Sequence, residues 1–234
     1  APGSPERIAL EACYESMYNQ EPIEVPMYIG SKQLTTDDKR TMTPPHEHGK
    51  VLGHFSYGTS EHVRKAIDAA LEARPAWSSL PWEHRAAVFL KAADLVAGPY
   101  RPKINTATML SQGKNCFQAE IDAACEFADF LRFNAFYAQE IHAQQPESAD
   151  GIWNRLEYRP LEGFVFAITP FNFTAIAGNL PAVAALMGNV VVWKRTQERF
   201  RRALMSAQLL LVNGVVEQKD GVIHVIAGAL YDHT

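Results

Sequence analysis

The chain has 234 residues, of which 47% are hydrophobic and 21% are charged, and its formal net charge at pH 7 is −4. This length allows one large domain or two ordinary ones, and the hydrophobic content suffices for a packed core. Acidic and basic residues are interspersed, so residues 1–194 offer no extended basic field to a phosphate backbone. Nucleic-acid binding by this part of the chain is therefore not expected.

The three cysteines, Cys13, Cys116 and Cys125, have the spacing of neither a metal site nor a disulfide framework, which favours a reducing compartment. No apolar run reaches the roughly 18 to 20 residues of a membrane helix, and the polar first residues contain no hydrophobic signal region. We expect a soluble protein without a membrane partner. Its expected location is the cytoplasm, or the mitochondrial matrix if the source is eukaryotic.

An extended arm and then helices are predicted for the first hundred residues. Residues 6–18 have a helical pattern, and residues 22–34 read as strands with a turn at Gly30. Thr59 or Ser60 can cap the next helix, and Pro81 at a first helical position opens another. The predicted apolar faces of these two helices are Val63, Ala66, Ile67, Ala70 and Leu71 in the first, and Ala86, Phe89, Leu90, Ala93 and Leu95 in the second.

Two more helices are predicted, over residues 101–110 and over a long alanine-rich segment from 117 to about 144. The apolar stripe of the long helix is predicted to include Ile121, Cys125, Ala128, Leu131 and Ile141.

Two histidines, His46 and His48, alternate in a proline-rich loop at residues 43–49. No cysteine or carboxylate cluster at ligand spacing accompanies them, so no metal site is predicted.

Residues 160–194 read as a strand, a turn, a short helix and a second strand, which is half of a nucleotide-binding βαβ unit. Residues 164–168 and 190–193 have the length and the β-branched or aromatic content of buried strands. Thr169 to Asn172 breaks the first strand, because Pro170 cannot donate to a ladder. Ligands of open α/β sheets collect at the carboxyl ends of strands, so the Asn172 amide stands where it could serve chemistry.

The tail after residue 196 changes in character. Residues 209–218 and 222–227 read as two strands, and the Asp220-Gly221 step between them is a strong hairpin signal. Arg199, Arg201 and Arg202 form a small basic cluster ahead of these strands. A solvated helix face is the usual meaning of such a cluster, and a contact with a nucleic-acid backbone is the alternative.

Residues 162–180, Glu-Gly-Phe-Val-Phe-Ala-Ile-Thr-Pro-Phe-Asn-Phe-Thr-Ala-Ile-Ala-Gly-Asn-Leu, followed by a strand ending in Trp193-Lys194, resemble the aldehyde dehydrogenase superfamily. More narrowly, they look like its Δ1-pyrroline-5-carboxylate dehydrogenase branch. Separated upstream blocks occur in the family's order and extend the resemblance over residues 3–194: Pro26–Gly30, Ala66–Leu71, Phe89–Asp94 and Gln118–Ala123.

The resemblance also identifies what the chain lacks. No Gly-Gln-Xaa-Cys block, which holds the family's nucleophile, occurs here, and the glycine-rich turn of the family's next Rossmann helix is absent. Lys194 is followed by Arg195-Thr196 where the branch usually has a proline and a small residue. Beyond this point the tail is similar to an OB-fold segment of bacterial error-prone DNA polymerase III α-subunits.

Roles for individual residues are implied by the resemblance. Asn172 would donate a hydrogen bond to the oxyanion of the tetrahedral intermediate, whereas an isolated asparagine after a proline is ordinary turn chemistry. The other implied roles are NAD contacts by Ile168, Thr169, Pro170, Phe171 and Lys194, and substrate contacts by Phe173 and Glu120. Glu120 would gate the substrate entrance. The plainer alternatives are a core aromatic for Phe173 and solvated charged groups for Lys194 and Glu120.

The predicted fold is α/β, with an amino-terminal arm and a helical layer leading into an incomplete, Rossmann-like doubly wound sheet. Residues 1–194 would form an incomplete NAD-binding domain, and residues 195–234 a foreign or divergent β-hairpin.

Three functions remain open. The first is NAD-dependent oxidation of glutamate γ-semialdehyde, formed from pyrroline-5-carboxylate, to glutamate in proline catabolism. The second is a non-catalytic binding module, such as an OB-fold fragment on an inactive scaffold. The third is a truncated or fused product. We expect no turnover from this chain alone, a small aldehyde as substrate, and a homo-oligomer for a full-length protein.

Overall fold

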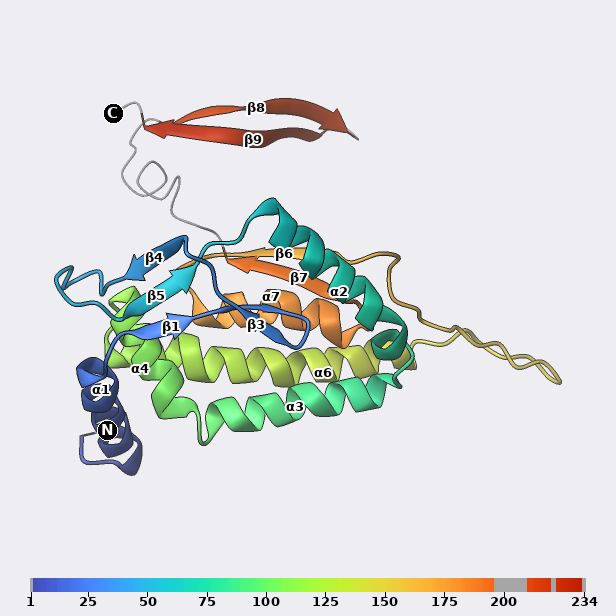
Figure 1. Ribbon diagram of the computed structural model, residues 1–234. Helices are drawn as coiled ribbons and strands as arrows, with labels where there is room; N and C mark the ends of the chain where they lie inside the picture. Colours follow the sequence, from blue (N-terminus) through green and yellow to red (C-terminus); the bar gives the residue numbers. More distant parts are fainter. Residues whose placement is uncertain (1, 196–209, 220–221, 233–234) are drawn as a thin grey trace. The chain divides into compact units, whose positions relative to one another are not determined.

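The computed structural model describes residues 2–195, 210–219 and 222–232 (Figure 1). The chain divides into two compact units, Ala1–Lys194 and Arg195–Thr234, and each is described by itself. The basic cluster at residues 199–202 lies outside the described residues.

The first unit begins with a helix and an extended arm, as predicted. Helix α1 (Pro5–Asn19) has Ser4 as its N-cap, with the Ser4 hydroxyl accepting from the Arg7 backbone N–H. The arm contains the strands β1 (Ile23–Val25), β2 (Met27–Ile29), β3 (Lys32–Leu34), β4 (Lys39–Met42) and β5 (Gly53–Ser56). Strand β5 pairs in parallel with β1 and antiparallel with β4, and β2 pairs with β3 through the turn at Gly30.

Three helices follow the arm: α2 (Ser60–Ser78), α3 (Trp82–Ala97) and α4 (Arg101–Gln112). Thr59 is the N-cap of α2, as expected, but Pro81 is the N-cap of α3 and not its first helical residue. The predicted apolar faces are only partly covered, since Val63, Leu71 and Leu90 are exposed.

The predicted long helix is three segments: α5 (Cys116–Ala119), a π-helix η1 (Glu120–Glu126) and α6 (Phe127–Ala143). A π turn carries more residues per turn than an α turn, so it shifts the faces of the helix relative to one another. The predicted stripe is therefore wrong in its first half, and Ile141 at its other end is exposed as well. Ile121 and Cys125 are exposed, whereas Asp122, Ala123 and Ala124 are buried.

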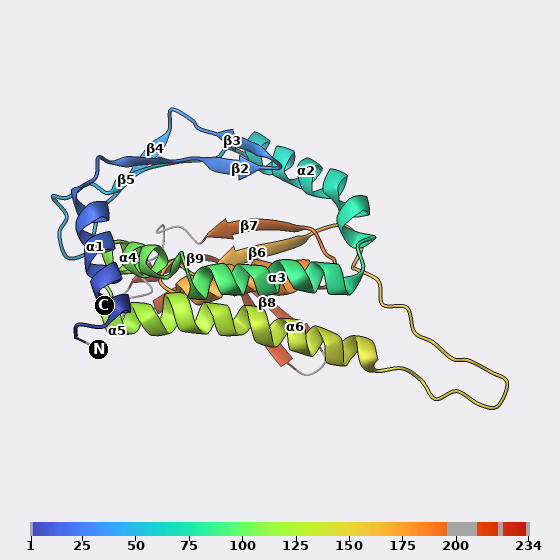
Figure 2. The same cartoon turned by 90° about the horizontal axis from the view of Figure 1, so that it is seen from below.

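The βαβ unit has the predicted order: β6 (Val165–Thr169), α7 (Thr174–Leu186) and β7 (Val191–Arg195). The two strands are neighbours in one sheet, and their arrows point the same way (Figure 2), while α7 lies next to them (Figure 1). Ala167 and Val192 are buried, while Phe166, Ile168 and Trp193 on the strands are about half exposed. One face of this sheet is therefore covered and the other is open. The α/β class and the Rossmann-like entry are confirmed.

Beneath α7 the core is built from small residues of α3 and α6. Ala93, Ala128 and Leu131 form one buried cluster, with Phe89 and Phe127 packed against it. Residues 144–164 then leave the helices as a long arm (Figures 1 and 2), on which Ile152, Trp153 and Leu156 are exposed.

The second unit is described as a β-hairpin of β8 (Leu210–Lys219) and β9 (Val222–Asp232), paired antiparallel from Lys219↔Val222 to Leu210↔Asp232. A register shift lies at Asn213/Gly214. The hairpin prediction is correct, although β9 is longer than expected.

Candidate functional site

The turn that carries Asn172 lies between the end of β6 and the start of α7. Helix α7 begins after Phe173, which is its N-cap but gives no side-chain capping bond. The Asn172 side chain is half-buried, and its amide has no hydrogen-bond partner among the described residues. A neutral amide at this position is therefore free to donate to a ligand at the carboxyl edge of the sheet.

Two charged side chains hold this turn from the outside. Asp122, from η1, accepts from the backbone N–H groups of Thr174 and Ala175 at 3.0 and 3.1 Å. Lys114, from the loop between α4 and α5, donates to the Asp122 carboxylate and to the Asn172 carbonyl oxygen, each at 2.7 Å. The Lys114 ammonium also lies 4.4 Å from the centre of the Phe173 ring.

The start of α7 is tied to α4 as well. The Thr174 hydroxyl is 2.8 Å from the Thr108 hydroxyl and accepts from the Gln112 side-chain amide at 3.0 Å. Thr108 is buried. Residues of α4, η1 and the intervening loop thus meet at the first turn of α7, and they fix the backbone next to Asn172.

The strand ends offer a partial fit to NAD. Thr169 is fully buried, with its hydroxyl accepting from the Trp193 indole N–H at 2.9 Å, so its side chain is turned away from a ligand. The Lys194 side chain is exposed at the end of β7, where an ammonium can reach ribose hydroxyls. The residues present fit the ribose part of the cofactor.

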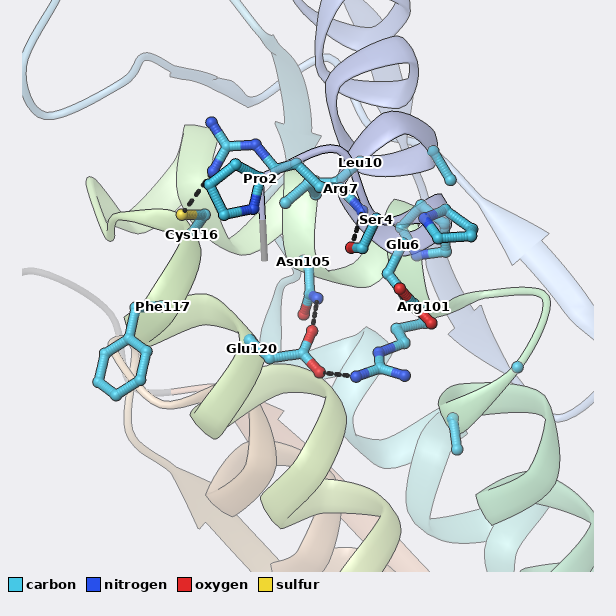
Figure 3. Close-up of a pocket in the computed structure, with 15 residues that line it drawn as sticks. Pro2, Ser4, Glu6, Arg7, Leu10, Arg101, Asn105, Cys116, Phe117 and Glu120 are labelled. Atoms are coloured by element: carbon cyan, nitrogen blue, oxygen red, sulfur yellow. Dashed lines mark hydrogen bonds and ion pairs between the residues drawn. The ribbon is translucent and has the colours of Figure 1, made fainter.

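Glu120 belongs to a different place in the first unit. It lines a cavity of about 630 Å³ between α1, α4, α5 and η1, where Arg101 and Asn105 point toward it (Figure 3). Arg101 is ion-paired with Glu120, and the Asn105 amide donates to the same carboxylate at 2.6 Å. Residues 168–173 do not line this cavity.

The electrostatics of Glu120 follow from these contacts. Burial raises the pKa of the carboxyl, but hydrogen bonds from Arg101, Asn105 and Cys125 outweigh it and leave the pKa below its ordinary value of 4.5. Burial also raises the pKa of the Cys125 thiol, and its hydrogen bond to Glu120 adds to that effect. A thiol held in its neutral form is a poor nucleophile.

The other two cysteines also have contacts away from the turn. Cys116 lies 3.3 Å from an Arg7 nitrogen, and Cys13 lies 3.8 Å from the Met17 sulfur. In the described part of the chain, no group of three or more His, Cys, Asp or Glu side chains could hold a metal ion. No helix in that part is long and apolar enough to cross a membrane.

The structure brings together residues 168–173 and Lys194 at one strand edge, and it leaves Glu120 in a separate cavity. Sequence reasoning missed the Lys114–Asp122 pair that holds the turn. The signal was an aspartate between Ile121 and two alanines, because a charged side chain within an apolar part of a helix is buried only when it is paired.

A βαβ unit that carries a half-buried amide on its turn and an exposed lysine near the next strand end is typical of nucleotide-binding α/β folds. The chain belongs to the aldehyde dehydrogenase family, whose model matches residues 34–232. The match therefore includes the described strands of the tail.

Within this family, the chain is most informatively compared with relatives of one named kind. Over 229 residues, 97% of this chain and 41% of the relative, the chain is 51% identical to Delta-1-pyrroline-5-carboxylate dehydrogenase of Agaricus bisporus. It is 48% identical over 192 residues to the mitochondrial Delta-1-pyrroline-5-carboxylate dehydrogenase of Homo sapiens, covering 82% of this chain and 34% of that protein.

Among solved structures, the Delta-pyrroline-5-carboxylate dehydrogenase of Mycobacterium tuberculosis bound with NAD matches with a TM-score of 0.81 and 51% identity. That match covers 84% of this chain and 37% of the other chain. The chain thus spans about two fifths of the length of the relatives it matches.

Proposed function

We propose that this chain carries the oxyanion donor and one side of the NAD site of a Δ1-pyrroline-5-carboxylate dehydrogenase. The whole protein would oxidise glutamate γ-semialdehyde to glutamate in proline catabolism. The observation that carries the proposal is the Asn172 amide, which has no partner among the described residues and sits on a turn fixed from both sides. Identity of 51% to a dehydrogenase bound with NAD supports the cofactor.

The chain's own residues would contribute binding and charge stabilisation. Addition of a thiolate to an aldehyde places negative charge on the carbonyl oxygen, and the Asn172 amide would donate a hydrogen bond to that oxygen. The Lys194 ammonium would bind the adenosine ribose, and the backbone of residues 168–171 would lie near the nicotinamide ribose. Phe173, which is exposed, would form a wall of the aldehyde tunnel. When bound, NAD accepts the hydride.

The nucleophile would come from the part of the family that this chain does not match. The three cysteines contact Met17, Arg7 and Glu120. We therefore propose that the purified chain has no turnover on its own.

Compartment, assembly and the Glu120 role are further parts of the proposal. The human relative is named mitochondrial, which supports a mitochondrial matrix location if this protein is eukaryotic, and a cytoplasmic one otherwise. The exposed Ile152, Trp153 and Leu156 on the long arm support a homo-oligomer, because a monomer gains nothing by exposing them. By resemblance to the family, Glu120 would gate substrate entry, although residues 168–173 do not line its cavity. The foreign origin of residues 195–234 and their OB-fold likeness stay predictions.

A chimera tests the proposed activity. This chain replaces the matching 229 residues of the Agaricus bisporus relative, and NADH formation from pyrroline-5-carboxylate is followed by absorbance. We expect saturable NADH formation, and a kcat lower by about 100-fold to 1,000-fold in the Asn172→Ala variant. A chimera that unfolds cooperatively but forms no NADH, beside an active parent enzyme, would contradict the proposal. Steady turnover by this chain alone would contradict the proposal that its nucleophile comes from elsewhere.

A further inference from the structure

We propose that Lys114 and Asp122 are positioning residues for Asn172. Their ion pair, in which Asp122 is buried and Lys114 is partly buried, holds the turn that carries the amide, and neither side chain is among the proposed substrate contacts. The inference goes beyond the proposed function, and only its catalytic consequence rests on that function.

The π-helix η1 places the first member of the pair. Asp122, Ala123 and Ala124 are consecutive and all buried. In an α-helix that packs on one neighbour, three consecutive side chains point about 100° apart and do not all face that neighbour. Asp122 thereby faces the first turn of α7, where free backbone N–H groups need acceptors. Its two oxygens accept from Thr174 and Ala175, and Asp122 is only 4% exposed.

The loop after α4 places the second member. Gly113 ends α4 with φ of 67°, a left-handed conformation that glycine adopts without strain, and a Cβ there would also press on Pro45. Asn115 then caps α5 by accepting from the Gln118 N–H. Lys114, fixed between two helix ends, directs its ammonium to Asp122 and to the Asn172 carbonyl.

The contact with Asn172 separates this pair from an ordinary helix cap. Capping α7 requires only Asp122. Lys114 adds a charge-assisted hydrogen bond to the carbonyl of Asn172 itself and a cation–π contact with the next residue, Phe173. Lys114 therefore holds the carbonyl of Asn172, and Asp122 holds the N–H groups of Thr174 and Ala175, so the backbone on the C-terminal side of the Asn172 side chain is fixed by both members of the pair. A preorganised donor of this kind costs no reorganisation during reaction.

A test on this chain measures the turn directly. The double variant Lys114→Met/Asp122→Asn leaves no unpaired buried charge and keeps an oxygen for the α7 cap, so it should fold even if Lys114→Met alone does not. We expect the backbone order parameters of residues 171–173, from ¹⁵N relaxation, to fall from about 0.85 to below about 0.6. Those of α3 should not change. Lys65→Met, which breaks the exposed Lys65–Glu61 pair, is the matched control and should leave the turn unaffected.

A second test uses the chimera described above. The double variant should lower kcat by about 10-fold to 100-fold and change the KM for NAD by less than about 2-fold, because misplacement of the donor acts on the transition state. The conservative variant Lys114→Arg should keep most of the wild-type kcat, unlike the double variant. Unchanged order parameters at residues 171–173 would overturn the proposal. So would an unchanged kcat in the double variant while Asn172→Ala lowers it. If Asn172→Ala leaves kcat unchanged, the proposed function fails, and the relaxation measurement alone decides whether the pair holds the turn.

Discussion

The contacts that a titratable side chain makes in this chain change its pKa from the ordinary value. Glu120 shows this most clearly. Its carboxylate accepts hydrogen bonds from Arg101, Asn105 and Cys125. These contacts favour the charged form of the carboxyl, which burial alone would disfavour. The side chain is 31% exposed, which limits how much stability the pair provides.

The free energy of unfolding should depend on the ionisation of Glu120. Its pKa is lower in the folded chain than the ordinary 4.5, so its contribution is complete above that value and is lost as the pH falls through the folded pKa. Urea unfolding at several pH values below 5 should show a larger loss for the wild type than for Glu120→Gln. Parallel pH profiles for the two proteins would show that the Arg101 contact does not stabilise the charge.

Sequence reasoning located Asn172 because a proline inside an apolar run ends the strand and brings the next residues to the edge of the sheet. It could not find Lys114, which is separated from Asn172 by 58 residues and meets it only in the folded chain. The same limit applies to Arg101 and Asn105 beside Glu120. Local patterns indicate where a backbone turns, whereas ion pairs between elements require the tertiary arrangement.

At the scale of elements, the π-helix is the feature that the sequence did not reveal. Periodicity predicted one continuous helix over residues 117–144, because the alanine-rich sequence does not mark the point at which the helical period changes. The structure has three segments, and the shift between them separates the exposed Ile121 from the buried Ala128. Helix existence was predictable here, and its faces were not.

Insertion of one alanine after Cys125 should rotate Asp122 by about 100° relative to α6, because η1 already holds the extra residue that a π turn can absorb. The ion pair with Lys114 would then be lost, at a cost of about 3 to 5 kcal/mol. We expect the thermal midpoint to fall by at least about 6 °C in a calorimetric or circular dichroism scan. Cys125→Ala is the control, because it keeps the helix length and should change the midpoint far less. An insertion variant as stable as this control would mean that the register set by η1 does not position Asp122.

The packing of α7 on α6 depends on Gly178. A glycine inside a helix ordinarily costs up to about 1 kcal/mol relative to alanine, so its substitution would stabilise α7 if there were room. A Cβ at position 178 would instead overlap the Phe127 ring. Gly178→Ala should therefore destabilise the chain by about 1 to 3 kcal/mol in urea unfolding. In a Phe127→Leu background the same change should cost less. Stabilisation by Gly178→Ala in the wild-type background would refute this account.

At the scale of the whole molecule, the two units differ in architecture. The first unit has cores between α3, α6 and α7, whereas the second is described as a two-stranded hairpin. The family match reaches residue 232 although the sequence character changes after Lys194. Composition and periodicity predicted both parts, but they carry no information on how strongly the hairpin is stabilised.

Amide exchange should separate the two units. A hairpin alone is marginally stable in water, so amides of β8 and β9 should exchange much faster than those of α3 and α6 when measured by mass spectrometry. The helices between residues 60 and 143 serve as the internal reference. Equal protection in the hairpin and the helices would indicate one integrated domain and would count against a foreign tail.

The carboxylate of Asp122 also occupies a position at the N-terminus of α7 where a phosphate group could otherwise bind. In many nucleotide-binding folds the first helix after a strand offers its N-terminal N–H groups to the pyrophosphate. Here the same groups of α7, on Thr174 and Ala175, already bind an anion that belongs to the protein. The negative charge of Asp122 would repel the phosphates of a dinucleotide at this helix. Those phosphates would therefore need hydrogen-bond donors or cations at another place. On the proposed function, the strand edge would be left to ribose hydroxyls and the carbonyl oxygen of a substrate.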